Sequence, residues 1–434
     1  MAETDSGLPV QFVAAGETPK QQSTNLEMVK PSPGYPTCAQ LLADAIARRA
    51  DVAVLDYTPQ QVTIRFQIDM VWHTMPPMDR ETGDYMMATL KQLAGLDFRD
   101  RRSRQEGTFR TDMMRNRFDT RLVTQGIRTG ERAAIYIEAR KKEPMETLEQ
   151  LGMREKMIER VTKLLSRSDA SMMLVSALPG EGYTTFWRSV LSASDRFTRD
   201  YYVIEEAGRV EEEVINITGL TYDESAGETA FTPIPRLLLK QPNVLVFPEV
   251  PDGGTVDQIC DLSQREDLPM IIRNVGKTCA DGLMRLVSLE PDMSKLAENL
   301  TGVVSMRLIR KLCPNCRIPF TPNPIFLQKL GIPPGRVHML YKAFEYQPGM
   351  VDEQGVEIPV CHECHGIGYK GLTGLFEFLE IDDEIRALLL SGARMDALMA
   401  LLQKKNHVGL REEGVVMIAR GMTSVEELQR VLKK

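Results

Sequence analysis

Four of the chain's seven cysteines stand in two close pairs, at the spacing of a metal site. Cys313 and Cys316 enclose the first pair, C-P-N-C, and after 44 further residues Cys361 and Cys364 enclose the second, C-H-E-C. Two such pairs supply four soft thiolates, the ligand set of a tetrahedral structural zinc. Because four cysteines fill all four positions, the sequence predicts a structural Zn²⁺ here and not a catalytic one.

Two other interpretations of these cysteines stay open at this point. Either the four thiols are reduced and hold no metal, or a neighbouring histidine, His362 or His365, replaces one thiolate. The remaining cysteines, Cys38, Cys260 and Cys279, are scattered along the chain. We expect them to be small buried hydrophobic residues, because disulfides are rare in a cytosolic chain.

The stretch MLVSALPGEGYTTFW, residues 173–187, has the order of an apolar strand, a glycine-rich turn and a helix start. That order, with the pattern G-x-x-x-x-G-K-[ST], is typical of a phosphate-binding loop. Ala177 stands in place of the first glycine, and Tyr183 stands in place of the lysine. The candidate residues for nucleotide binding in this loop are Gly180, Gly182, Tyr183, Thr184 and Thr185.

The two replacements predict weak binding of a nucleoside triphosphate. A lysine ammonium at this position contacts the β- and γ-phosphates. The phenol of Tyr183 offers at most one neutral hydrogen bond and is bulkier. Glu181 is expected to add a negative charge facing the phosphates. The sequence therefore predicts that ATP or ADP with Mg²⁺ binds weakly here.

Hydrophobic periodicity predicts the elements that carry these residues. Apolar strands such as MMLVSAL, NVLVFPEV and LPMIIRNV alternate with helical stretches, which indicates an α/β domain around a buried parallel sheet. The last helix, in SVEELQRVLKK, is expected to have Ser424 or Thr423 as its N-cap, with Glu427 at capping-box spacing. The predicted parts are a disordered tail over 1–35, a small α+β domain over 36–140, an α/β core over 141–312, a tetracysteine module over 313–366 and a helical region over 367–434.

Composition limits the function classes. The chain has 434 residues and a formal net charge of −7, so charge argues against nucleic-acid binding. It contains no long apolar run and no secretory signal, which predicts a cytoplasmic protein without a membrane span. Nine arginines between residues 99 and 128 lack the interleaved aromatic residues of a nucleic-acid site, and we interpret them as a solvated strand-edge face.

Several longer stretches of the sequence resemble a known protein family. RLIRKLCPNC and CHECHGIGYKGLTGLFEFLEIDDEIRALLLSGA resemble the C-terminal half of the type II secretion and type IV pilus assembly ATPases, the secretion protein E family. FDTRLVTQ, LEQLGM and LREEGVVMIARGMTSVEEL are similar to further segments of that family, from about residue 36 to the end. The resemblance implies a RecA-like P-loop NTPase core in a cytoplasmic hexamer that works at an inner-membrane platform. The family's additional N-terminal docking domain is expected to be absent.

The resemblance also assigns roles to particular residues. It implies that Thr184 holds magnesium, that Glu205 belongs to an acidic box and that Glu249 lies near the metal, the two glutamates being the catalytic candidates. It places Arg121 near a nucleotide phosphate or a subunit contact. Several positions depart from the family pattern: Arg209, Pro248, Pro251 and Gly276, the last of which stands where a histidine belongs.

Losses in several motifs together favour a degenerate ATPase. The sequence predicts a subunit or scaffold of a secretion or pilus assembly machinery with weak or absent ATP hydrolysis, in a homo- or hetero-hexamer. Its two alternatives are an active, divergent hexameric ATPase that powers assembly and a regulatory module that senses a nucleotide without cleaving it.

Overall fold

The structure, a computed structural model, describes most of the chain: residues 8–140, 145, 147–333, 335–352, 354–392 and 394–433. The chain divides into two compact units, residues 1–144 and 145–434. In the described residues, no helix combines the length and the apolar character that crossing a membrane requires.

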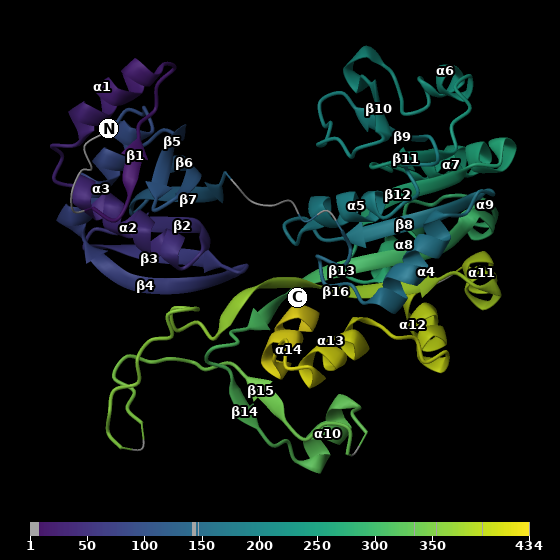
Figure 1. Ribbon diagram of the computed structural model, residues 1–434. Helices are drawn as coiled ribbons and strands as arrows, with labels where there is room; N and C mark the ends of the chain where they lie inside the picture. Colours follow the sequence, from purple (N-terminus) through teal and green to yellow (C-terminus); the bar gives the residue numbers. More distant parts are fainter. Residues whose placement is uncertain are drawn as a thin grey trace. The chain divides into compact units, whose positions relative to one another are not determined.

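The first unit is built on one antiparallel sheet of seven strands (Figure 1). In spatial order, the strands are β1 (Gln11–Val13), β5 (Gln105–Met113), β6 (Asn116–Ile127), β7 (Gly130–Ala139), β2 (Ala50–Tyr57), β3 (Gln61–Ile68) and β4 (Val71–Asp79). Three helices accompany the sheet: α1 (Pro19–Val29), α2 (Tyr35–Ala47) and α3 (Arg80–Leu93). Alternate side chains of β3 are buried, as expected for a strand with one covered face.

The N-terminal segment corrects the prediction of a disordered tail over 1–35. Residues 1–7 lie outside the described part, but from residue 8 the chain forms β1 and α1. The ring of Phe12 is buried and makes T-shaped contacts with the rings of Tyr35 and Phe109, at 5.4 and 5.9 Å between centroids. Thr18 caps α1. Because β1 has three residues, its alternation of apolar and polar side chains is too short to be recognised within a polar segment.

The second unit contains a seven-stranded sheet in which β16 runs antiparallel to β13 and the other neighbouring strands are parallel. In spatial order, its strands are β10 (Ile217–Tyr222), β9 (Tyr201–Glu206), β11 (Val244–Phe247), β12 (Pro269–Val275), β8 (Ser171–Ala177), β13 (Leu300–Leu312) and β16 (Tyr369–Glu380). The accompanying helices are α4 (Glu155–Leu165), α5 (Tyr183–Ser192), α6 (Ile234–Leu238), α7 (Gly253–Glu266), α8 (Cys279–Val287) and α9 (Met293–Asn299), with a 3₁₀ turn at Glu224–Ala226.

Both faces of this second sheet are covered. Met172 and Leu174 of β8 join a core with α7, α8 and α9, whereas Met173 and Val175 join a core with α4 and α5. Successive side chains of a strand point to opposite faces, so a strand covered on both sides reads as one continuous apolar run. This is the α/β architecture that the alternating strands and helices predicted.

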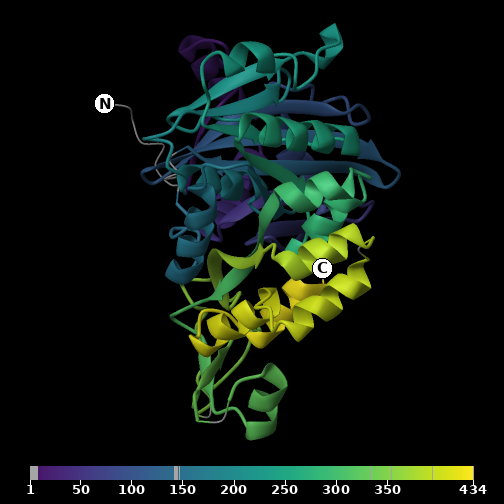
Figure 2. The same ribbon diagram turned by 90° about the vertical axis from the view of Figure 1, so that its right-hand side faces the viewer.

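The region after the core corrects a second prediction. Residues 367–434 were expected to be helical, but Tyr369–Glu380 form the edge strand β16, whose apolar run pairs with β13. The segment between these strands holds β14 (Ile318–Phe320), α10 (Pro324–Leu330) and β15 (Leu340–Lys342). The chain ends in α11 (Asp383–Leu390), α12 (Met395–Lys404), α13 (Leu410–Ala419) and α14 (Val425–Lys433), drawn in yellow in Figures 1 and 2.

Candidate functional site

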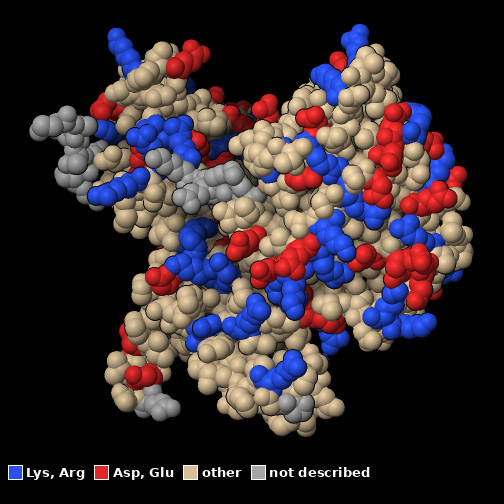
Figure 3. Space-filling model, turned by 45° about the vertical axis from the view of Figure 1, so that its right-hand side comes forward, with Lys and Arg blue, Asp and Glu red and all other residues tan. Residues whose placement is uncertain are grey.

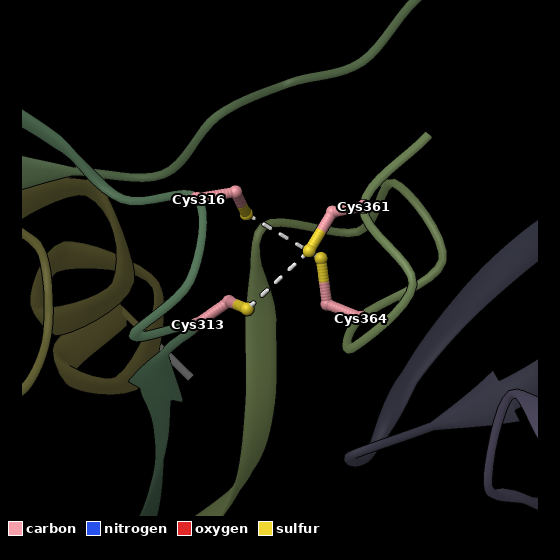
Figure 4. A group of neighbouring side chains, drawn as sticks. All are labelled: Cys313, Cys316, Cys361 and Cys364. Carbon is pink, nitrogen blue, oxygen red and sulfur yellow. Dashed lines mark hydrogen bonds between the residues drawn. The ribbon is translucent and has the colours of Figure 1, made fainter. Parts of the chain in front are cut away.

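The pairing of β13 with β16 brings the two cysteine pairs together. Cys313 follows the end of β13, and Cys361 and Cys364 precede the start of β16. The amide of Cys313 donates to the carbonyl of Gly368 at 2.9 Å, which extends the ladder between the strands. All four sulfur atoms lie within 4.8 Å of one another (Figure 4). The Sγ atoms of Cys313 and Cys361 are 3.8 Å apart, and those of Cys316 and Cys364 are 3.5 Å apart.

These distances fit a tetrahedral metal site. A zinc–sulfur bond of about 2.3 Å places the sulfurs of a tetrahedral set about 3.8 Å apart. Two hydrogen bonds support negative charge on the sulfurs, because Asn315 Nδ2 donates to Cys361 Sγ and the amide of Gly368 donates to Cys364 Sγ, each at 3.3 Å. Within the described residues, the cluster is made of cysteines alone, and the side chain of His362 is 80% exposed.

Burial and hydrogen bonds shift the pKa values of the cluster's thiols in different directions. Burial opposes ionisation of Cys361, but the hydrogen bonds from Asn315 and from within the cluster lower its pKa to about 7. Burial raises the pKa of Cys316 and of Cys364. Thiolates are the form that binds metals, and a divalent cation among the sulfurs would stabilise all of them.

The phosphate-loop stretch forms the predicted strand, turn and helix. The turn connects β8 to α5, with Gly180 and Gly182 in the left-handed region at φ 77° and 74°. Thr184 and Thr185 lie exposed in the first turn of α5. The left-handed φ favours glycine at position 182, and a Cβ there would also make a tight contact, 3.1 Å from the terminal methyl of Met306.

Glu181 corrects the expectation that its charge faces a phosphate. Its carboxylate is buried and accepts two hydrogen bonds from the guanidinium of Arg307 in β13, at 2.6 and 3.1 Å. Arg307 is 2% exposed and follows Met306, the partner of Ala177 at the end of β8. It therefore lies beside the turn, and the glutamate points inward to neutralise it. The ion pair thus anchors the turn to β13.

We expect Glu181→Ala to lower the free energy of unfolding by about 3 kcal/mol, since it leaves Arg307 buried without its counter-ion. Chemical denaturation of the purified chain measures this loss. The matched control is Asp169→Ala, which breaks the exposed pair of Asp169 with Arg167 just before β8 and should change stability by no more than about 0.5 kcal/mol. Equal effects of the two variants would contradict the anchoring role.

Arg273 is a site residue that the sequence did not single out. It lies in β12, and its guanidinium carbon is 4.6 Å from the ring centroid of Tyr183 and 5.1 Å from that of Trp187. Its Nη1 is 2.7 Å from a carboxylate oxygen of Glu211, and its Nε donates to the carbonyl of Pro248 at 3.2 Å. Burial raises the pKa of the Tyr183 phenol. In the sequence, the sign that could have identified Arg273 was its position as a single charged residue inside the apolar strand LPMIIRNV.

The two candidate catalytic glutamates have different surroundings. Glu249 follows β11 and accepts a hydrogen bond from Nη1 of Arg209 at 2.8 Å. Glu205, near the end of β9, is 9% exposed and accepts one from the amide of Glu211 at 3.3 Å. Burial raises the pKa of Glu205. Arg209, noted in the sequence as a departure from the family pattern, thus neutralises one of the two carboxylates.

Arg121, the other residue assigned to a phosphate, belongs to the first unit. Its guanidinium pairs with Glu106 at 3.0 Å and lies 4.1 Å from the ring centroid of Tyr136. On the face of the molecule in Figure 3, basic and acidic side chains are likewise interspersed among other residues.

Comparisons with known proteins agree with this architecture. The family model described as type II/IV secretion system protein matches residues 29–430. Type II secretion system protein E of Dickeya dadantii is 26% identical over 431 residues, which cover 99% of this chain and 82% of that protein. The type IV pilus assembly ATPase PilB of Thermus thermophilus is 24% identical over 90% of this chain and 42% of its own length.

One solved structure supports the fold independently of sequence. The Legionella pneumophila ATPase DotB superposes with a TM-score of 0.51 over 90% of this chain and 94% of that one, at 12% identity. At this identity the likeness shows a shared fold and no more.

Proposed function

This chain belongs to the type II/IV secretion system protein family, and on that premise we propose that it is a subunit of a secretion or pilus assembly machinery that hydrolyses ATP weakly or not at all. Its place is the cytoplasm, at the inner membrane through contacts with platform proteins. It acts in a hexameric ring, either of its own copies or mixed with an active member of the family.

One observation carries this proposal: three carboxylates around the phosphate loop are each paired with an arginine of the same chain. The pairs are Glu181 with Arg307, Glu211 with Arg273, and Glu249 with Arg209. Transfer of a phosphoryl group needs a cation on the β- and γ-phosphates and a carboxylate that orients water or metal. Here Tyr183 supplies no charge, Arg273 is buried against Glu211, and Glu249 is bound to Arg209.

The remaining groups of the loop support weak anion binding. The backbone amides at the start of α5 and the exposed hydroxyl of Thr184 favour an anion. We therefore propose Gly180, Gly182, Tyr183, Thr184 and Thr185 as the contacts of a weakly bound ATP or ADP, with Mg²⁺ on Thr184. Glu205 and Glu249 keep their places in the fold but have no catalytic role in this proposal.

For the tetracysteine cluster we propose a structural zinc ion. The sulfur spacing and the two N–H···S hydrogen bonds support it. With four protein ligands the ion has no open position, so it joins the segment between β13 and β16 to the sheet and takes no part in the reaction.

We expect ATP turnover by the purified chain at least about 100-fold slower than that of an intact family member, because losing one preorganised cation typically costs about 100- to 1000-fold in rate. A coupled assay with Mg²⁺ measures both proteins under one condition. Glu249→Gln should leave this low rate unchanged.

The same measurement separates the alternatives. Turnover at ordinary motor rates that Glu249→Gln abolishes would identify an active ATPase and would contradict our proposal. Tight nucleotide binding in a separate titration, without turnover, would identify a module that senses the nucleotide, whereas our proposal expects only weak binding.

A further inference from the structure

The position beside residue 183 already holds a cation. We propose that Arg273, held by Glu211 and covered by the ring of Tyr183, is the second residue that keeps nucleotide binding at this loop weak, so that Tyr183 and Arg273 must be exchanged together before the site can bind ATP tightly. The inference rests on the proposed loss of ATP hydrolysis and names the residue that enforces it.

The strand register places Arg273 under the loop. β12 runs parallel to β8, and Arg273 is the partner of Val175, two residues before β8 ends at Ala177. The side chain reaches Tyr183 and Trp187, which lie one turn apart on α5. The carbonyl of Pro248, just after β11, accepts from its Nε. The guanidinium therefore lies among the carboxyl ends of three strands and the first turn of the helix.

Arg273 is fixed at this place. It is 7% exposed, and a buried guanidinium needs its counter-ion and hydrogen bonds to stay charged. Glu211 supplies the counter-ion, while the faces of Tyr183 and Trp187 favour the cation through their π-electrons. Moving the guanidinium toward a phosphate would break the contacts with Glu211 and Pro248.

A lysine at position 183 would therefore meet a like charge. The ring face that stabilises Arg273 would be replaced by an ammonium on the neighbouring turn of chain, in surroundings where charges are poorly screened. Lysine there either repels Arg273 or turns away from the loop, and neither outcome forms the phosphate contact. Restoring the lysine alone is thus not expected to restore the site.

A double-mutant cycle isolates this repulsion from the loss of the ring. Tyr183→Met and Tyr183→Lys are compared in the natural background and in one that carries Arg273→Met with Glu211→Gln, which removes the cation and its counter-ion together. In the natural background, we expect the lysine variant to melt about 4–6 °C below the methionine variant. In the uncharged background, the two should melt within about 1 °C of each other. The same difference in both backgrounds would overturn the proposal.

Binding of MgATP, measured by calorimetry, gives a second test. Tyr183→Lys alone should not tighten binding, whereas Tyr183→Lys combined with Arg273→Met and Glu211→Gln should tighten it at least about tenfold. A tenfold gain from Tyr183→Lys alone would overturn the inference. The natural chain's own turnover tests the proposed function separately, since active hydrolysis would refute that function whatever the cycle shows.

Discussion

Replacing Cys361 by serine is expected to remove the metal from the protein and to unfold the segment between β13 and β16. The structure keeps the four sulfurs within 4.8 Å of one another, and a hydroxyl does not replace a thiolate ligand. Structural zinc sites contribute an apparent binding free energy of about 10–16 kcal/mol in small zinc-binding peptides, and that energy is folding energy. This is the largest single effect that we expect from one side chain.

In the proposed site, the metal would join the two cysteine pairs at the base of this segment. The cysteines form a small buried cluster of their own, separate from the apolar core that α10 joins through Leu327. Zinc content per chain and limited proteolysis within residues 317–360 measure the effect of Cys361→Ser. The matched control is Cys260→Ser in α7, a buried cysteine outside the cluster, which should keep one zinc per chain.

Two results would contradict the zinc site. One is natural protein without zinc whose four cluster thiols react freely. The other is Cys361→Ser protein that keeps its zinc and resists protease as the natural chain does. Because the ligands are thiolates, zinc should also be lost as the pH falls, whereas a cluster without metal would show no such release.

The local patterns of the sequence predicted part of this molecule. The turn between β8 and α5 follows from an apolar run, two glycines and a helix start, all within residues 173–187. The meeting of the two cysteine pairs follows from metal-ligand spacing, although the strand pairing that causes it was not predicted. β16 was missed because its apolar run, GLFEFL, follows glycines and turns that resemble the rest of the metal module.

Which charged side chains pair with each other could not be predicted from the sequence. Glu181 and Arg307 are 126 residues apart, and only the fold places one beneath the other. The sequence alone therefore predicted that the charge of Glu181 faces the phosphates. Arg273 was passed over because a lone arginine in an apolar strand gives no hint of which side chains will cover it. In both cases the information lies in which strands become neighbours.

The ion pairs of Glu427, near the C-terminus, were likewise not predictable from the sequence. Its spacing from Ser424 predicted a capping box, and its amide does donate to the Ser424 hydroxyl oxygen, at 3.2 Å. Its carboxylate, however, is buried and binds two arginines. Arg310 of β13 donates to it through the backbone amide and the guanidinium, and Arg430 donates from one turn along α14. One carboxylate thus adds an ionic attachment to the apolar contacts of the final helix with the core sheet.

We expect Glu427→Gln to lower the free energy of unfolding by about 5 kcal/mol, the upper end of the range for a broken buried ion pair, because two guanidinium groups lose one counter-ion. Chemical denaturation at neutral pH measures this loss. Glu426→Gln, at the neighbouring exposed position, is the matched control and should change stability by no more than about 0.5 kcal/mol. Similar values for the two variants would refute the attachment.

The pH dependence of the same pair tests whether the effect is electrostatic. Although burial opposes it, the hydrogen bonds from Arg430 and Arg310 hold the pKa of Glu427 below its ordinary value of 4.5. A carboxylate whose pKa is lower in the folded than in the unfolded state stabilises the fold above the unfolded value and loses that contribution as the pH falls through the folded value. The difference between the natural chain and Glu427→Gln should therefore be full at neutral pH and shrink below pH 4.5. A difference that stays constant on acidification would mean that glutamine fails through packing alone, and that the charge on Glu427 does not hold the last helix.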